Sequence, residues 1–390
     1  MTLVGSWSPA ASGPAGPRRI AFIVDSWYRW SHADVIGTRF LEGYRVGNTT
    51  YTSPLTVGSV FPDAPYERDL TQLLASRYGF RVAASIPDAL LDDPRSPRPR
   101  FAADGVLIAT REDLPDSGQR QSPHRRLQVA QETFRLMDQT GTFVPVFIDK
   151  MLASSWADSQ TIVAEAARRR VSLMAGSVLP HTPLSRPLRV EGVAVGVVIA
   201  HTPYWAFAFH AAELLQSFLE KRAHRETGVR EIREVGIGFW SLPDRERWGG
   251  RVVDALLASP RTLSRRAPAV PAGLGSDTVV VLIQYIDGTR GVLALIPGVF
   301  DDSEFLLGAQ YRDGSISTSG IVLPGEPYDH FGYLVHALVE FFTTGRAPVP
   351  VQRTLLTTGI VLFGLESRQT GRAAISPGLE ISYAAPPARP

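Results

Sequence analysis

The sequence contains no cysteine, which excludes every site whose chemistry depends on a thiol. Disulfide bonds, thiolate metal sites and cysteine nucleophiles are therefore ruled out. The sequence also lacks a phosphate-binding P-loop, a Gly-x-Ser-x-Gly nucleophile elbow, a kinase signature and a compact metal motif such as His-Glu-x-x-His. The motifs that mark NTPases, serine hydrolases, kinases and zinc proteases are thus absent.

Neither charge nor hydrophobicity is concentrated along the chain. The 40 basic and 38 acidic residues leave a formal net charge of +2 without a clustered basic face, so we expect no nucleic-acid partner. No apolar stretch approaches the roughly 20 residues of a membrane span, so we expect no membrane association. Residues 1–17 lack the pattern of a signal peptide. We predict a disordered leader there, a loose tail at 384–390 and a cytoplasmic location.

Lysine is scarce among the basic residues. Of the 40 lysines and arginines, only Lys150 and Lys221 are lysines. A buried lysine can lose its proton, whereas arginine effectively cannot, so a retained lysine can serve acid–base chemistry. Chance survival is the alternative interpretation, and we favour it for Lys221, which lies in a charged helical run. Lys150 directly follows an apolar run and is the stronger candidate.

The first part of the chain, residues 18–150, alternates short apolar runs with helical patterns. Such alternation predicts an α/β, Rossmann-like domain with a doubly wound parallel sheet. We expect strands at 19–25, 55–61, 81–84, 104–110 and 144–149, and helices at 31–44, 66–78, 86–91 and 125–140.

The pattern changes after residue 150. We expect residues 151–383 to form an α+β domain with a large, mainly antiparallel sheet and helices on one face. A chain of 390 residues is long enough for two domains. We expect strands at 172–175, 190–200, 229–239, 278–286 and 291–296, and helices at 155–170, 209–222, 328–344 and 355–367.

Four residues stand at the carboxyl ends of expected strands in the first domain. They are Asp25, Phe61, Thr110 and Lys150. Ligands of doubly wound sheets bind beyond these ends, so the residues there are site candidates. A lysine at the end of a buried strand is suited to acid–base chemistry, because burial lowers the pKa of its ammonium group. The alternative for Lys150 is a structural ion pair with Asp149 or Glu213.

Four segments carry a resemblance to a known family. They are VFIDKMLASSWADSQTIVAEAARRR at 146–170, LMAGSVLPHTP at 173–183, FHAAELLQSFLE at 209–220 and FFTTGRAPVPVQRTLLTTGIVLFGLESRQTGR at 341–372. Together they resemble the Gfo/Idh/MocA family of nicotinamide-dependent sugar and polyol dehydrogenases. The resemblance covers most of residues 18–372.

The resemblance implies an oxidoreductase that acts on a hydroxylated small molecule, sugar- or polyol-like, with NAD or NADP as cofactor. It also implies a homo-oligomer, a dimer or a tetramer, with the sheet of the second domain as a contact face. Lys150 matches the family's lysine near the reacting carbon, and His210 matches its general base. Glu213 lies one helical turn after His210 and is placed to orient the imidazole.

The sequence departs from the family at the first turn. The family runs from its first strand into Gly-x-Gly-x-x-Gly, whose glycines let a pyrophosphate approach the start of a helix. Here DSWYRWSHADVIG stands at 25–37, and the bulky residues 27–30 obstruct such an approach. The missing aspartate of the family's Asp-x-x-x-His motif is a second departure, since Ala206 stands in its place. The alternative function is a cofactor-independent or metal-dependent non-redox enzyme, a lyase, isomerase or hydrolase, on the same fold.

Other polar residues near strand ends and helix starts complete the set of candidates. His32 and Asp34 stand at a helix start, where a dinucleotide phosphate would otherwise lie. The plainer interpretation is that Asp34 complements the helix dipole and His32 lies on the surface. The substrate-binding candidates are His32, Asp34, Glu112, His181, Arg186, Tyr204 and Glu213, and the cofactor-binding candidates are Ser26, Asp63 and Thr110.

A divalent metal ion is a further hypothesis without a committed site. Nitrogen and oxygen donors suit such ions, although the spacing of the candidate residues follows no compact motif. We assign His330 and His336, on a late helix, to packing. The ligand set would be His32, Asp34, Glu112 and His210.

Overall fold

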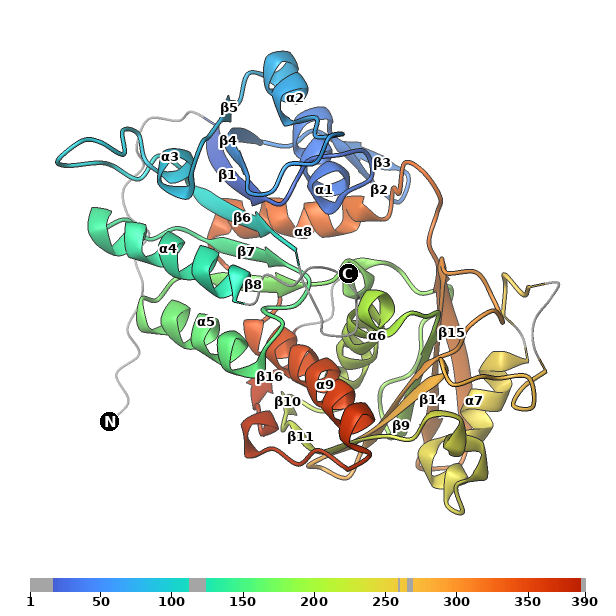
Figure 1. Ribbon diagram of the computed structural model, residues 1–390. Helices are drawn as coiled ribbons and strands as arrows, with labels where there is room; N and C mark the ends of the chain where they lie inside the picture. The colour runs from blue at the N-terminus through green and yellow to red at the C-terminus, as the bar shows by residue number, and fades with distance from the viewer. Residues whose placement is uncertain (1–16, 112–123, 259, 265–268, 387–390) are drawn as a thin grey trace.

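The computed structural model describes residues 17–111, 124–258, 260–264 and 269–386, which form two six-stranded sheets with helices packed against them. In Figure 1 the first sheet lies in the upper part of the view and the second sheet lies at the lower right. The first sheet is parallel and the second is mainly antiparallel. This arrangement confirms the predicted fold class, a Rossmann-like α/β unit combined with an α+β unit.

The first sheet is buried on both faces, as its apolar runs predict. Along the central strand β1, Phe22 points into one core and Ile23 into the other. The strand order is β5-β4-β1-β6-β7-β8. The strands are β1 (Arg18–Val24), β4 (Leu55–Pro62), β5 (Arg81–Val82), β6 (Gly105–Ala109), β7 (Val146–Asp149) and β8 (Leu173–Gly176).

The helices of this part begin and end close to the predicted positions, with one difference. The helix expected at 66–78 begins only at Thr71, because the Asp69 carboxylate accepts the N–H groups of Thr71 and Trp27 and holds the preceding segment in turns. A short hairpin, which the sequence did not predict, follows α1. These elements are α1 (His32–Glu42), β2 (Tyr44–Val46), β3 (Thr49–Tyr51), α2 (Thr71–Tyr78), α3 (Ile86–Leu90), α4 (Arg125–Thr140) and α5 (Trp156–Arg168).

The second sheet contains two strands that the sequence did not predict, β14 and β15. Ser317, Thr318 and Ser319 follow one another in β15, and Glu304 and Gln310 bound the apolar run of β14, which weakens the strand pattern of both segments. The central pair β13 and β9 is parallel. The strand order is β11-β12-β13-β9-β14-β15, with β9 (Val193–Ala200), β11 (Val229–Glu234), β12 (Val279–Tyr285), β13 (Arg290–Leu295), β14 (Glu304–Tyr311) and β15 (Ile316–Val322).

Helices cover both faces of this sheet, so the expectation of helices on one face was wrong. α6 (Tyr204–Leu219) and α9 (Val351–Thr370) share one core with it, whereas α7 (Gly250–Leu257) packs on the opposite face. The four inner strands β9, β12, β13 and β14 have apolar side chains on both faces of the sheet, which requires cover on both sides. Although α9 runs for 20 residues, neither it nor any other helix in the described ranges is long and apolar enough to cross a membrane.

Two elements from the later part of the chain pack on the first sheet. Strand β8 is an edge strand of the first sheet. Helix α8 (Phe331–Thr344) packs on one face of the same sheet, beside α1 (Figure 1). The ring of Phe342 sits so close to Gly105 that a side chain at that position would lie 2.5 Å from it. Elements from the later part of the chain therefore belong to the first sheet and its cover. The domain boundary at residue 150 stays a prediction.

A buried ion pair joins the end of α6 to α9 and to the C-terminal segment. The Arg353 guanidinium donates to Glu220 at 3.1 and 2.8 Å, and the Tyr383 hydroxyl donates to the same carboxylate at 2.8 Å. Tyr383 belongs to β16 (Tyr383–Ala384), which pairs with β10 (Arg225–Glu226). Removing one member of such a pair leaves an uncompensated charge in the interior.

We expect Arg353→Met to lower the free energy of unfolding by about 3–5 kcal/mol, since it would strand the Glu220 carboxylate. Urea denaturation followed by circular dichroism measures this change. Arg100→Met is the matched control, because it removes an exposed pair with Asp92 and is expected to leave the free energy of unfolding close to that of the wild type. Equal losses for the two variants would contradict the interpretation.

Candidate active site

A cavity of about 430 Å³ opens between elements of the first sheet and elements of the second. The start of α1, the first turns of α6 and the segments 302–305 and 323–331 form its wall. Most of the wall is aromatic or aliphatic, and a few polar groups converge on it, as is usual for small-molecule sites. Its lining includes Trp30, Phe207 and Tyr328 together with three histidines, His32, His210 and His330.

The local structure explains how each basic group reaches this place. His32 is the first residue of α1, directly after Ser31, whose side chain caps the helix. His210 lies two turns into α6. Lys150 follows the last residue of β7, and its backbone N–H donates to the Gly176 carbonyl at 3.0 Å. Three different elements therefore bring these side chains together.

Left-handed backbone conformations occur at two residues that line the cavity, Trp30 and Tyr328, and at Lys150. Their φ values are 68°, 60° and 61°, and residues other than glycine adopt such values at a cost of about 1–2 kcal/mol. The rings of Trp30 and Tyr328 meet edge to face at 5.3 Å. Strained backbone that persists in a folded chain is concentrated at functional sites, so this clustering favours the cavity as the active site.

His210 is held from behind by a buried polar chain. Its Nδ1 lies 2.6 Å from the Ser177 hydroxyl. The Ser177 N–H donates to the Glu213 carboxylate at 3.3 Å, and the Thr357 hydroxyl donates to the same carboxylate at 2.5 Å. Gly176 makes this contact possible, because a Cβ there would lie 2.6 Å from the carboxylate oxygen. The other ring nitrogen of His210, Nε2, is the one left for the cavity.

Burial and neighbouring charge set the protonation states of these groups. Burial, the Lys150 ammonium and His32 lower the pKa of His210 to about 3. Burial and the charge of Arg39 lower the pKa of His330 to about 4. Both imidazoles are therefore neutral at neutral pH.

Asp149 forms a close pair with His32 at the end of β7. Its Oδ2 lies 2.7 Å from His32 Nδ1, although the two groups are not aligned as a regular hydrogen bond. Burial alone would raise the pKa of the Asp149 carboxyl, but His32, Lys150 and Arg126 together hold that pKa below its ordinary value. A buried carboxylate thus faces the histidine at neutral pH.

Polar groups of the turn between β1 and α1 are bonded to carboxylates of the same chain. Asp69 accepts hydrogen bonds from the Ser26 hydroxyl at 2.7 Å and from the Trp27 N–H at 2.8 Å. Asp34, in the first turn of α1, accepts the Trp30 N–H at 2.9 Å. Two carboxylates of the chain itself therefore occupy N–H groups of the kind that bind a pyrophosphate at a helix start.

The Trp27 side chain fills the space beneath this turn. Its indole is fully buried, stacks between Phe22 and Phe80 and donates Nε1–H to Asp34 at 3.2 Å. Any side chain at Gly37 would collide with the indole. The residues present do not fit the pyrophosphate of a dinucleotide in the manner of the glycine fingerprint, and the Asp34 charge would repel it.

Two of the three cofactor-binding candidates have side-chain partners within the chain. Ser26 donates to Asp69. Asp63 pairs with the Arg125 guanidinium, with Nε at 2.5 Å. Thr110 is buried, and its carbonyl accepts the Arg126 guanidinium at 3.2 Å, whereas its hydroxyl has no hydrogen-bond partner among the described residues. A cofactor role for these residues stays a prediction.

The structure brings some of the substrate-binding candidates to the cavity and leaves others elsewhere. His32 lines the cavity with His210, and Glu213 lies behind them. The remaining candidates are Asp34 in the β1–α1 turn, Tyr204 bonded to the Val361 carbonyl, Arg186 bonded to Thr318 on β15, His181 at the end of the short helix Leu179–His181, and Glu112 outside the described residues.

The suggested metal ligands are not gathered into a site. Within the described ranges, no group of three or more His, Asp or Glu side chains is arranged to hold a metal ion. His32 is paired with Asp149 and Asp34 is bonded within its turn, while Glu112 lies outside these ranges. We therefore derive no step through a metal ion.

Three residues of the site were not among the sequence candidates: Asp149 as a partner of His32, Ser177 and His330. Nothing in the spacing of the sequence links residue 32 to residue 149. His330 was assigned to packing, and it does contact Phe331, but it also lines the cavity. The Gly-Ser pair at 176–177, directly after a strand, was the available signal for Ser177.

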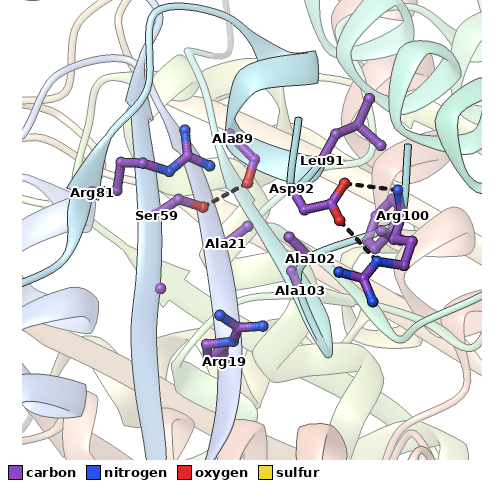
Figure 2. Close-up of a pocket in the computed structure, with 12 residues that line it drawn as sticks. Arg19, Ala21, Ser59, Arg81, Ala89, Leu91, Asp92, Arg100, Ala102 and Ala103 are labelled. Carbon is purple, nitrogen blue, oxygen red and sulfur yellow. Dashed lines mark hydrogen bonds and ion pairs between the residues drawn. The ribbon is translucent and has the colours of Figure 1, made fainter. Parts of the chain in front are cut away.

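A second hollow, of about 440 Å³, lies toward the amino ends of β1 and β6 (Figure 2). Two pairs form within its lining, Arg100 with Asp92 at 2.9 Å and the Ser59 hydroxyl with the Ala89 carbonyl at 2.7 Å (Figure 2). Arg81 pairs with Asp88. No histidine or lysine lines it, so it offers no acid–base group near neutral pH.

Solved structures share this arrangement along nearly the whole chain. GenD2 from gentamicin A biosynthesis, in complex with NAD, is 14% identical, with a TM-score of 0.57 over 95% of this chain and 99% of that one. The apo scyllo-inositol dehydrogenase from Lactobacillus casei is 11% identical, with a TM-score of 0.57 over 92% and 98%. A putative myo-inositol dehydrogenase from Sinorhizobium meliloti 1021 is also 11% identical, with a TM-score of 0.53 over 92% and 99%.

The chain shares the fold of these structures. This agrees with the resemblance seen in the sequence, and at these identities the likeness concerns the fold. No family model and no curated protein matches the chain.

The buried neutral histidines make stability depend on pH. An unfolded histidine takes up a proton near its ordinary pKa of 6.5, whereas folded His210 resists until about 3. As the pH falls from about 6.5 to about 4, the unfolded state therefore gains protons that the folded state does not, and the free energy of unfolding decreases.

We expect the thermal unfolding midpoint to fall over this pH range, and to fall less steeply in His210→Gln. The readout is the slope of the midpoint against pH, which separates the titration from any general loss of stability. His224→Gln, at an exposed histidine, is the control and is expected to keep the wild-type slope. An unchanged slope in His210→Gln would show that this imidazole titrates normally.

Proposed function

We propose that the chain is an enzyme that acts on a hydroxylated small molecule, sugar- or polyol-like, in the cavity between the sheets. The observation that carries the proposal is that His32 and His210 line one cavity with apolar walls, with the Lys150 charge close enough to lower the pKa of His210. The apolar walls exclude water, which strengthens electrostatic interactions with a bound substrate.

In this proposal Lys150 and His210 have acid–base roles. The Lys150 ammonium stabilises negative charge that develops on a substrate oxygen. The His210 imidazole, neutral at neutral pH, exchanges a hydrogen bond or proton with the substrate through Nε2. Glu213 and Ser177 hold the ring, and Trp30 and Tyr328 supply flat surfaces for a sugar ring.

An oxidoreductase is one form of the proposal, and the solved structures support it. GenD2 was solved with NAD, and two other similar structures are described as inositol dehydrogenases. This form needs NAD or NADP. Because the β1–α1 turn does not fit a pyrophosphate in the family's manner, we derive no step through a nicotinamide.

A non-redox enzyme, a lyase, isomerase or hydrolase, is the second form. The observation that favours it is the pair of carboxylates, Asp69 and Asp34, on the N–H groups of the β1–α1 turn. This form needs only the acid–base groups of the cavity. Of the two forms, the geometry of the turn favours this one.

The expected partners follow from the same proposal. We infer a small-molecule ligand and neither a nucleic-acid nor a membrane partner. A homo-oligomer, dimer or tetramer, stays a prediction of the resemblance, as does a cytoplasmic location. Because α7 packs on the outer face of the second sheet, an assembly through that face would include α7 in the contact.

We expect Lys150→Gln and His210→Gln each to lower turnover by about 10²- to 10⁴-fold, since general acid–base groups contribute effects of that size. The assay incubates the protein with a panel of sugars and polyols, with and without NAD and NADP, and follows the substrates by NMR. Lys221→Gln, at the only other lysine, is the control and is expected to retain full turnover. Wild-type turnover in both site variants would overturn the proposal.

We expect no binding heat when NAD or NADP is titrated at millimolar concentration into the protein by calorimetry. The physical reason is that the backbone donors of the β1–α1 turn are already bonded to Asp69 and Asp34. Saturable binding would contradict the non-redox form and favour the oxidoreductase. This titration is independent of whether a substrate has been found.

A further inference from the structure

The two histidines that face the cavity have different partners on their Nδ1 atoms. His32 Nδ1 meets a carboxylate, the Oδ2 of Asp149, at 2.7 Å. His210 Nδ1 meets a hydroxyl, the Oγ of Ser177, at 2.6 Å. In a neutral imidazole one nitrogen is a donor and the other an acceptor, and the partner of one nitrogen decides the state of the other.

The Asp149 carboxylate has only lone pairs to offer. Nδ1 of His32 lies 2.7 Å from that oxygen without the alignment of a regular hydrogen bond. At this distance a bare Nδ1 would bring two negative partial charges together, whereas an N–H group brings a positive one to the carboxylate. Nδ1 of His32 therefore carries the proton. In the neutral ring, Nε2 is then an acceptor, and His32 lines the cavity.

Ser177 imposes the opposite state on His210. Its oxygen already accepts the Leu179 N–H at 3.2 Å, and the residue is 1% exposed. Its hydroxyl proton needs an acceptor, and in the described part of the chain His210 Nδ1 is the one within hydrogen-bond distance. Nδ1 of His210 therefore accepts, and Nε2 of the neutral ring carries a proton.

We propose that His32 and His210 present complementary atoms to the cavity, an acceptor Nε2 on His32 and a donor Nε2–H on His210, fixed by Asp149 and Ser177 as positioning residues. The catalytic use of these two atoms rests on the proposed function. It makes His32 the proton acceptor and His210 a hydrogen-bond donor. The substrate's O–H bond breaks and its proton passes to His32 Nε2. The electron pair stays on the substrate oxygen, and His210 donates a hydrogen bond to an oxygen of the substrate.

The charges around the two rings agree with this assignment. The Lys150 ammonium disfavours a proton on His210, and His32 and His330 act in the same direction, whereas Asp149 opposes them. An imidazolium formed on His32 is paired with the Asp149 carboxylate. His210 remains a neutral donor while His32 gains and loses the proton.

The test is a two-bond ¹⁵N–¹H correlation spectrum of the full chain labelled with ¹⁵N-histidine, at about pH 7 and without ligand. This spectrum distinguishes the two neutral tautomers and the charged ring. The His32→Gln and His210→Gln variants assign the two resonance sets. We expect Nδ1–H for the neutral form of His32 and Nε2–H for His210, while exposed His224 shows averaged tautomers.

Variants of the positioning residues give a second measurement. In Ser177→Ala the preference of His210 for Nε2–H is expected to be lost, and Ser177→Thr, which keeps a hydroxyl, is expected to restore it. In Asp149→Asn the preference of His32 for Nδ1–H is expected to weaken, because an amide can donate to that nitrogen. If a variant fails to fold, the wild-type spectrum still decides the assignment.

The outcome that overturns the inference is Nδ1–H or a charged ring on His210, or Nε2–H on neutral His32, in the wild-type spectrum. Unchanged tautomers in both Ser177→Ala and Asp149→Asn would overturn the role of these residues. Failure of the proposed function would instead appear as wild-type turnover in Lys150→Gln and His210→Gln. The spectra require no substrate, so the two failures are distinguishable.

Discussion

The close contact between the end of β8 and helix α6 determines how the two halves of the molecule meet. Gly176 leaves room for the Glu213 carboxylate, and the next N–H along the chain, that of Ser177, donates to it. Helix α9 joins the same contact through Thr357. Because Glu213 lies one turn after His210, this contact sets both the position of α6 against the first sheet and the direction of the imidazole. A side chain at residue 176 would displace the Glu213 carboxylate from this contact.

The carboxyl ends of β1 and β7 carry different kinds of polar groups. At the β1–α1 turn the Asp69 and Asp34 carboxylates accept backbone N–H groups, and the Trp27 side chain is buried beneath the turn. At the end of β7 the charges of Asp149 and Lys150 lie close enough to His210 to act on its pKa. The fold is shared with dehydrogenases, whereas the chemistry depends on groups placed by this particular chain.

Much of the fold followed from local patterns, and most of the site did not. The runs at β1, β6 and β7 are apolar because both faces of the sheet are covered, so they were predictable. Strand β15 was not predictable, since a polar strand forms only through contacts with distant parts of the chain. The position of helix α7 was not predictable either, because such contacts also decide which face of the sheet a helix covers. Lys150 and His210 were predicted because the resemblance includes them, while the role of Ser177 follows from its contact with the His210 ring.

The sequence by itself determined the alternation of strands and helices, the bulky first turn and the position of Lys150 directly after a buried strand. These features depend on neighbours along the chain, whose spacing is set by the periods of strand and helix. Only the tertiary structure decided that Asp149 faces His32, that Ser177 faces His210 and that Asp69 caps the first turn. Those contacts join residues tens to more than a hundred positions apart, and no local periodicity specifies which distant groups will meet.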